Sequence, residues 1–146
     1  MKALLIKKET ASGSNTVNVL QSYGIHTKHV PFILFPKVKD LYKQSWHDED
    51  GDDEYLPENP SYESYEMKVD FVYNGEANTA NDKIRQFLQF LQGGWLTLYD
   101  EYTGIGRQKV RYVSVDDDAT LYRRTKDVVQ FSVNFKVNDP ATNVTL

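Results

Sequence analysis

Alternation of apolar and polar residues is the feature that most constrains how this chain folds. In Tyr65–Tyr73 the odd positions are apolar or aromatic, and Glu66, Lys68 and Asp70 lie between them. The same period of two runs through Val129–Val137. Because successive side chains of a strand point to opposite faces of a sheet, both segments are predicted to be strands with one buried face.

Shorter apolar runs are predicted to add strands to the same fold. They are Leu4–Lys7, Val17–Leu20, Val30–Phe35, Trp95–Tyr99 and Gln108–Val115. Turn residues are expected to end or join the strands. They are Asn74-Gly75 after the first alternating run, Gly104 and Gly106 in a bend over residues 100–107, and Asn138-Asp139-Pro140 after the last strand.

One segment has helical instead of strand periodicity. Ile84, Phe87, Leu88 and Leu91 are spaced i, i+3, i+4 and i+7, which places them on one stripe of a helix. A capping box is predicted at Thr79-Ala80-Asn81-Asp82, and Gly93-Gly94 is a stop signal, so the helix is expected over residues 79–92. The predicted fold class is mainly β with one α-helix, an antiparallel β-sandwich or half-barrel with the helix packed on it.

Length and composition limit the possible classes. The 146 residues fit a single domain, residues 1–146, and the absence of cysteine excludes disulfides and thiol chemistry. The net charge of −4 does not indicate a nucleic-acid-binding protein. The first eight residues hold only a short apolar run between lysines, so neither a secretion signal nor a membrane span is expected.

Residues 43–64 differ from the rest of the chain because they show no sustained periodicity. Six of the 21 acidic residues fall within positions 48–54, and Trp46, Tyr55 and Tyr62 punctuate the segment. Connections of this length in a compact domain are usually functional or disordered, and the aromatic residues argue against simple disorder. We therefore predict that residues 43–64 form an extended arm or loop.

Metal and catalytic motifs are incomplete. The Asp48-x-Asp50-x-Asp52 run resembles a calcium loop, but Asp53 and Asn59 stand where that loop needs glycine and glutamate. The three histidines, His26, His29 and His47, do not have the spacing of a zinc site. No serine nucleophile motif is present. Adjacent Asp100 and Glu101 do not supply carboxyls that face each other across a cleft. We expect no catalytic residue, no cofactor and no metal, and therefore no enzyme.

The large supply of tyrosine and tryptophan admits three interpretations. The aromatic residues could form a half-buried shell, a protein–protein interface, or a stacking surface for sugars or single-stranded nucleic acid. Because an acidic segment and basic strands coexist in one small chain, head-to-tail association of identical copies is expected. The predicted interface residues are Trp46, Asp48, Asp50, Asp52, Tyr55, Tyr62, Tyr102, Arg107, Arg111, Arg123 and Arg124.

The order of these features resembles that of tailed-phage tail proteins. The resemblance covers residues 31–140 and is carried by the acidic run at 46–55, the Tyr65–Tyr73 strand, the helix that ends at Gly93-Gly94, the Tyr-Thr-Gly-Ile-Gly-Arg turn at 102–107, and the end at Phe131–Pro140. The sequence is similar to small tail proteins of phages and prophages of Bacteroides-like bacteria. More distantly it is similar to tail-tube proteins and to the N-terminal domain of distal tail proteins.

This resemblance implies a fold of tail-tube type and assembly as a homo-oligomer in hexameric rings. The sheets of neighbouring copies would join into an inner barrel, with residues 108–115 and 128–137 in the ring wall. Residues 43–64 would be the arm, anchored by Trp46 and Tyr55. Other tail proteins are the implied partners, DNA would only pass through a lumen, and no membrane is involved. The implied location is the virion tail, after assembly in the host cytoplasm. A sugar- or single-stranded nucleic-acid-binding β module is the alternative function.

Overall fold

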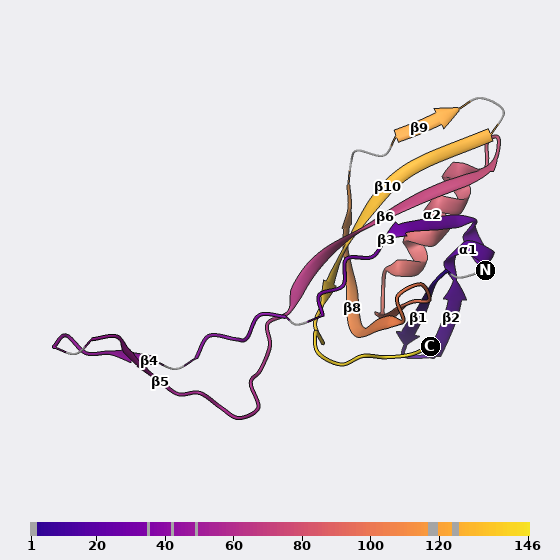
Figure 1. The fold of residues 1–146 in the computed structure, drawn as a ribbon. Helices are drawn as coiled ribbons and strands as arrows, with labels where there is room; N and C mark the ends of the chain where they lie inside the picture. Colours follow the sequence, from indigo (N-terminus) through magenta and orange to yellow (C-terminus); the bar gives the residue numbers. More distant parts are fainter. Residues whose placement is uncertain (1–2, 35, 42, 49, 117–119, 124–125) are drawn as a thin grey trace.

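A single antiparallel sheet forms the body of the protein (Figure 1). The computed structural model describes residues 3–34, 36–41, 43–48, 50–116, 120–123 and 126–146. The strands of this sheet are β1 (Leu4–Thr10), β2 (Gly13–Asn18), β3 (Ile25–His29), β6 (Tyr65–Glu76), β7 (Trp95–Asp100), β8 (Ile105–Val115), β9 (Thr120–Arg123) and β10 (Lys126–Val137). Their order is β2-β1-β7-β8-β10-β6-β3, with β9 paired to β10. The predicted mainly β, antiparallel class is confirmed.

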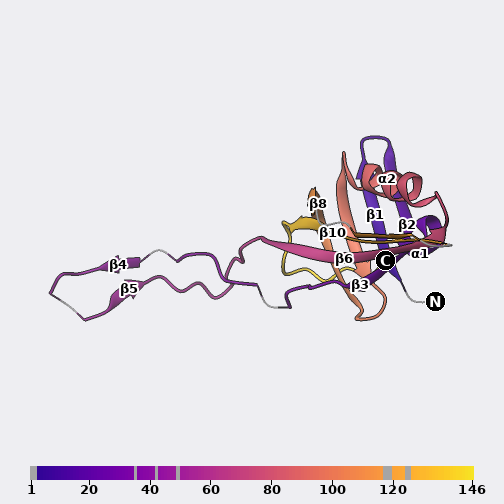
Figure 2. The same ribbon diagram turned by 90° about the horizontal axis from the view of Figure 1, so that it is seen from above.

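The sheet is bent, and α2 (Ala80–Leu91) packs inside the bend. Figure 2 shows the layer of β6, β10 and β3 edge-on, with β1 and β2 rising from it and α2 in the angle between them. Phe87 of α2 is fully buried, and its ring centroid lies 5.2 Å from that of Phe71 on β6 and 6.3 Å from that of Phe131 on β10. These aromatic contacts hold the predicted helix on the inner face of the sheet.

The pairing of β6 with β10 explains why the two alternating runs fold together. They pair antiparallel along their whole length, from Lys126 opposite Glu76 to Val137 opposite Tyr65. The inward positions Met67, Val69, Phe71 and Tyr73 are buried, as are the matching odd positions of β10. Directly opposed β-branched and aromatic side chains stabilise such a pair, so the period-two prediction is confirmed.

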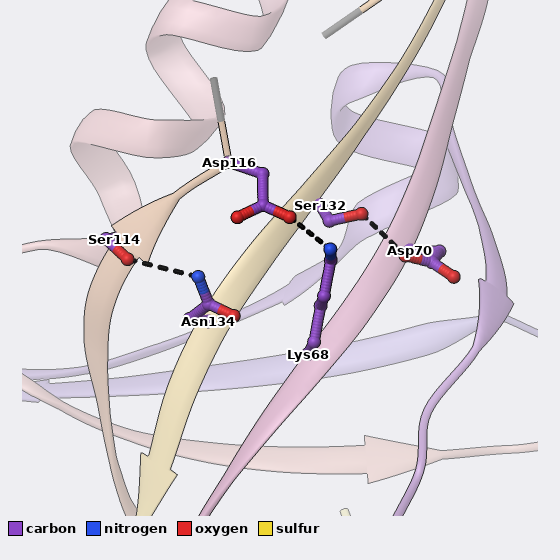
Figure 3. A network of polar contacts seen from close by, with 6 residues as sticks. All are labelled: Lys68, Asp70, Ser114, Asp116, Ser132 and Asn134. Atoms are coloured by element: carbon purple, nitrogen blue, oxygen red, sulfur yellow. Dashed lines mark hydrogen bonds and ion pairs between the residues drawn. The ribbon is translucent and has the colours of Figure 1, made fainter. Parts of the chain in front are cut away.

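The outward face of the same strands is polar and internally paired (Figure 3). Lys68 on β6 forms an ion pair with Asp116, just beyond β8. Ser132 donates a hydrogen bond to Asp70 at 2.5 Å, and Asn134 donates one to Ser114 at 3.1 Å. These contacts link β6, β10 and the end of β8. Several polar side chains on this solvent-facing side are therefore paired with one another.

The Asn74-Gly75 turn prediction is wrong. Both residues remain in β6, where Gly75 pairs with Asp127. A side chain at Gly75 would collide with the Tyr73 ring, so glycine here makes room for the aromatic residue and not for a turn. The chain turns later, and Asn78 has the positive φ of 67°.

Two other predicted boundaries also need correction. Val30–Phe35 is not a strand in its described part, residues 30–34, and Phe35 lies outside the described residues. The strand is β3, which ends before Pro31, since proline cannot donate to a ladder. Gly106 lies inside β8 instead of in the preceding bend.

The predicted Val17–Leu20 strand instead divides at Asn18. This residue ends β2 and caps a short second helix, α1 (Val19–Tyr23). Its side-chain oxygen accepts the Leu20 and Gln21 amides, both at 3.1 Å. The structure therefore contains a five-residue helix in addition to the predicted one.

The start of α2 is capped from a distant strand. Thr79 makes no side-chain capping bond, so the predicted capping box is wrong; its hydroxyl bonds to the Tyr73 hydroxyl at 2.6 Å and to the Glu76 carbonyl. The first helical amide, that of Ala80, donates at 3.2 Å to the carboxylate of Asp127 on β10, which is fully buried. A carboxylate suits this position because the helix N-terminus carries partial positive charge.

Candidate assembly surface

The most prominent surface feature is a hairpin that projects from the body, which we name the arm hairpin (residues 37–63). Its outer part pairs β4 (Lys43–Ser45) with β5 (Asp52–Glu54). Its base is closed by the Val38–Tyr62 bridge and by backbone hydrogen bonds of 2.8 Å (Lys39 amide to Ser61 carbonyl) and 2.7 Å (Glu63 amide to Lys37 carbonyl). Figures 1 and 2 both show it extending away from the sheet and helices. A paired backbone holds it extended without a hydrophobic core of its own.

The outer part of the hairpin, residues 43–54, carries an aromatic side chain among carboxylates; we name it the arm tip. The indole N–H of Trp46 donates to Asp53 at 2.8 Å, and Lys43 lies 3.8 Å from the Asp52 carboxylate. Asp48 and Asp50 are exposed at the turn. The Trp46–Asp53 bond fixes an exposed aromatic ring next to negative charge, which gives the tip a defined chemical character.

Behind the tip, apolar and aromatic side chains are largely exposed to solvent. Tyr55 is 68% exposed and Leu56 is 77% exposed, whereas Tyr62 is half-buried at the base. Ile33 and Leu34, which lead into the hairpin, are exposed as well. Clustered exposed apolar and aromatic residues on a projecting element are typical of protein–protein contact surfaces.

The structure describes the side chains of only some of the predicted interface residues on the body. Arg111 on β8 is exposed, and Tyr102 is exposed in the turn between β7 and β8. Arg123 is the last residue of β9, and its backbone lies opposite that of Asp127 in the β9–β10 ladder. Arg124 lies outside the described residues. Arg107 is only 4% exposed, so its prediction as a surface contact is wrong.

Arg107 instead joins three parts of the chain inside the body. Its guanidinium donates to the Gly106 carbonyl at 2.9 Å, to the Asn143 side chain at 3.3 Å and to the Ile33 carbonyl at 3.2 Å. It also lies 5.9 Å from the centre of the Phe32 ring. The side chain therefore connects the start of β8, the C-terminal segment and the chain that leads into the arm hairpin.

Replacing Arg107 with lysine is expected to lower the free energy of unfolding by about 1–2 kcal/mol, because an ammonium cannot reproduce a planar, forked set of donors. The Val144 amide, which donates to the Gly106 carbonyl at 3.1 Å, should then exchange its hydrogen faster. Urea unfolding and hydrogen exchange measure the two effects. The exposed Arg111→Lys is the control, with an expected change under about 0.5 kcal/mol. Unchanged stability together with unchanged Val144 protection would contradict the role given to Arg107.

The C-terminal segment is fastened to β8 by a carboxylate. Gln108 donates to Asp139 at 2.6 Å, and the Asn138 amide donates to the Lys109 carbonyl at 3.1 Å. Partial burial acts to raise the pKa of Asp139, but hydrogen bonds from Gln108 and Thr142 outweigh it and hold the pKa below its usual value. The folded state therefore favours the ionised form of this carboxylate.

A lowered folded-state pKa gives a signed pH dependence. The stabilisation by Asp139 should be complete above about pH 5 and be lost as the pH falls below about 4, through the folded-state pKa. We expect the stability difference between the unmodified chain and Asp139→Asn to shrink over this range in urea unfolding experiments. A difference that stays constant from pH 6 to pH 3 would show that Asp139 does not anchor the segment.

The two adjacent carboxyls at the end of β7 have structural roles. Asp100 accepts from the Tyr102 amide and the Thr103 hydroxyl, both at 3.1 Å, and so shapes the turn. Glu101 accepts from the Ala3 amide at 3.3 Å. Within the described ranges, no group of three or more His, Asp or Glu side chains is arranged to hold a metal ion. Neither described helix has the length and apolar character needed to cross a membrane.

Trp95, which the sequence predicts only as part of a strand, is a surface residue. It follows Gly93-Gly94 and opens β7, yet it is 51% exposed and lies beside the end of α2. Its exposure differs from that of the next three residues of β7, because Leu96, Thr97 and Leu98 are all buried. Alternation alone therefore does not distinguish Trp95 from the buried positions.

Comparison with known proteins identifies the fold. No protein-family profile and no curated protein matches the sequence. The crystal structure of the SPP1 Dit protein (gp 19.1), described as a paradigm of the hub adsorption apparatus in phages that infect Gram-positive bacteria, is similar over 95% of this chain, with a TM-score of 0.58 and 16% identity. The chain spans about half of that protein, 51% of its length. The expected fold of a tailed-phage tail protein is therefore confirmed, since this chain shares its fold with a phage hub protein.

Proposed function

We propose that this chain is a structural, non-enzymatic component of a phage tail that assembles with identical copies into a ring, six copies being the expected number. The observation that carries the proposal is the arm hairpin. It projects from a body of phage-hub fold and presents Trp46, Tyr55 and Leu56 to solvent. Such side chains gain most of their stabilisation when a partner buries them.

The ends of the sheet supply a second kind of contact. β2 and β3 are its terminal strands in the described part of the chain, so each has one edge without a strand partner there. Open strand edges pair readily with other chains, and β-sheet pairing between copies would extend the sheet around a ring. Other tail proteins would bind to the same assembly, and DNA would pass through its lumen.

Light scattering on the purified chain, followed by negative-stain imaging, tests the proposal. We expect a concentration-dependent shift to a closed oligomer and ring-shaped particles. A species that stays monomeric at millimolar concentration and gives no rings would overturn the proposal.

The alternative function is binding of sugar or single-stranded nucleic acid through stacking. It requires exposed aromatic rings that share one platform. Trp46 lies on the arm tip and Trp95 lies beside α2, so the geometry favours the assembly role. Quenching of tryptophan fluorescence by oligosaccharides or single-stranded DNA would favour the alternative.

A further inference from the structure

A groove lies where α2 ends and β7 begins. It has a volume of about 390 Å³ and is lined by Leu91, Gln92, Gly93, Gly94, Trp95, Arg111 and Tyr112. We name it the α2-end groove. It is separate from the arm hairpin, because all its lining residues come from α2, β7, β8 and the loop between α2 and β7.

The two glycines account for the shape of the groove. Gly93 has a φ of +82°, which reverses the chain after the helix. A side chain at Gly94 would collide with the Glu9 carbonyl, so only glycine fits at this position. The loop therefore packs close to β1, and the groove that it lines also borders Trp95.

Trp95 and Arg111 are neighbours on one face. Leu96 pairs with Val110, and both are fully buried on the inner face of the sheet. Trp95 comes one position before Leu96 and Arg111 one position after Val110, so the antiparallel register places the two residues side by side; both are exposed and both line the groove. An indole beside a guanidinium suits a ligand that offers both an aromatic ring and a carboxylate.

The arm tip offers this combination. Trp46 is held 2.8 Å from the carboxylate of Asp53, and Asp48 and Asp50 add exposed negative charge. The arm tip is acidic, whereas the groove contains the guanidinium of Arg111, so the two surfaces are complementary in charge. The arm of the same chain does not fill its own groove, because β4 and β5 lie far out from the body, away from α2 and β1 (Figure 2).

We propose that the arm tip of one copy binds in the α2-end groove of a second copy, with Trp46 against Trp95 and the acidic turn next to Arg111. This inference rests on the proposed assembly into a ring and specifies which surfaces meet. It gives the contact a direction, since the tip of one copy and the groove of the next are different surfaces, as closed rings require.

Because the chain contains no cysteine, any disulfide in a cross-linking test must join the introduced cysteines. Two tagged versions are mixed, one with Ser45→Cys on the arm tip and the other with Gln92→Cys at the groove, and are oxidised under assembly conditions. We expect a disulfide-linked dimer that contains both tags. The matched control replaces Gln92→Cys with Gln130→Cys, an exposed position on the outer face of β10, and should cross-link at least fivefold less.

Charge reversal tests the same contact without a covalent bond. Arg111→Glu alone and Asp48→Lys with Asp50→Lys should each weaken association at least fivefold in sedimentation experiments. A chain with all three changes should recover most of the lost affinity, because the opposite charges then meet again. Unchanged circular dichroism and urea midpoints check that the variants fold.

The outcomes separate the inference from the function beneath it. Rings that form without preferential linkage at position 92, or without recovery in the triple variant, overturn the groove as the docking site and leave the ring assembly intact. A chain that remains monomeric in light scattering overturns both.

Discussion

Replacement of residues 43–54 by a short Gly-Ser linker is expected to abolish ring formation while the body stays folded. The described residues of this segment are all exposed, and its ladder pairs only with itself. Its removal takes nothing from the core around Phe87, and shortening a surface loop changes the free energy of unfolding by only about 0.5 kcal/mol. Assembly, in contrast, would lose the aromatic and acidic surface that a partner is expected to bury.

Sedimentation velocity and negative-stain imaging measure the assembly, and thermal unfolding measures the body. Two point variants locate the effect: Trp46→Ala should weaken association by about tenfold or more, whereas Lys39→Ala, at the exposed base of the hairpin, should change it less than twofold. If the truncated chain still forms rings with the affinity of the full chain, the arm tip has no part in assembly, and contacts at the sheet edges and at Tyr55 and Leu56 must account for it.

The main elements could be predicted because their patterns are local. Alternation over Tyr65–Tyr73 and Val129–Val137 matched β6 and β10, and a 3.6-residue stripe matched α2. The errors fell where a contact from another part of the chain decided the outcome. Gly75 was expected to turn the chain, but the distant strand β10 keeps it in the ladder. The residues next to Gly75 in the sequence do not reveal which distant strand will pair with it.

The candidate surface was predictable in part for the same reason. The acidic and aromatic arm differs in composition from its surroundings, so its position was visible in the sequence. Arg107 was expected at the surface as one of the basic residues that would match the acidic segment of a second copy. Its burial depends on carbonyls and an amide at Gly106, Ile33 and Asn143, and only folding brings those groups together. Trp95 was placed in a strand, but its exposure depends on where α2 ends.

Among the buried polar residues of the body, Asp127 is the one whose replacement should lower the free energy of unfolding most. Its carboxylate accepts the Ala80 amide, and the two residues are 47 positions apart in the sequence. Asp127→Ala removes a charge-assisted hydrogen bond to the start of α2 and leaves a buried amide without its partner. We expect a loss of about 2–4 kcal/mol in the free energy of unfolding, measured by urea titration.

Two further variants separate the cap from the general cost of changing a buried site. Asp127→Asn keeps an acceptor oxygen of similar shape but loses the charge, so it should cost about half as much as alanine. Thr79→Ala removes the residue that local sequence rules would choose as the cap, and should cost about 1 kcal/mol, because its hydroxyl bonds to Tyr73 and to the Glu76 carbonyl but not to the helix amides. If Thr79→Ala proves more damaging than Asp127→Ala, the helix is capped by its own sequence. The order predicted here would instead mean that α2 is stable only once β10 is in place, so the helix and the central strand pair should unfold in a single transition.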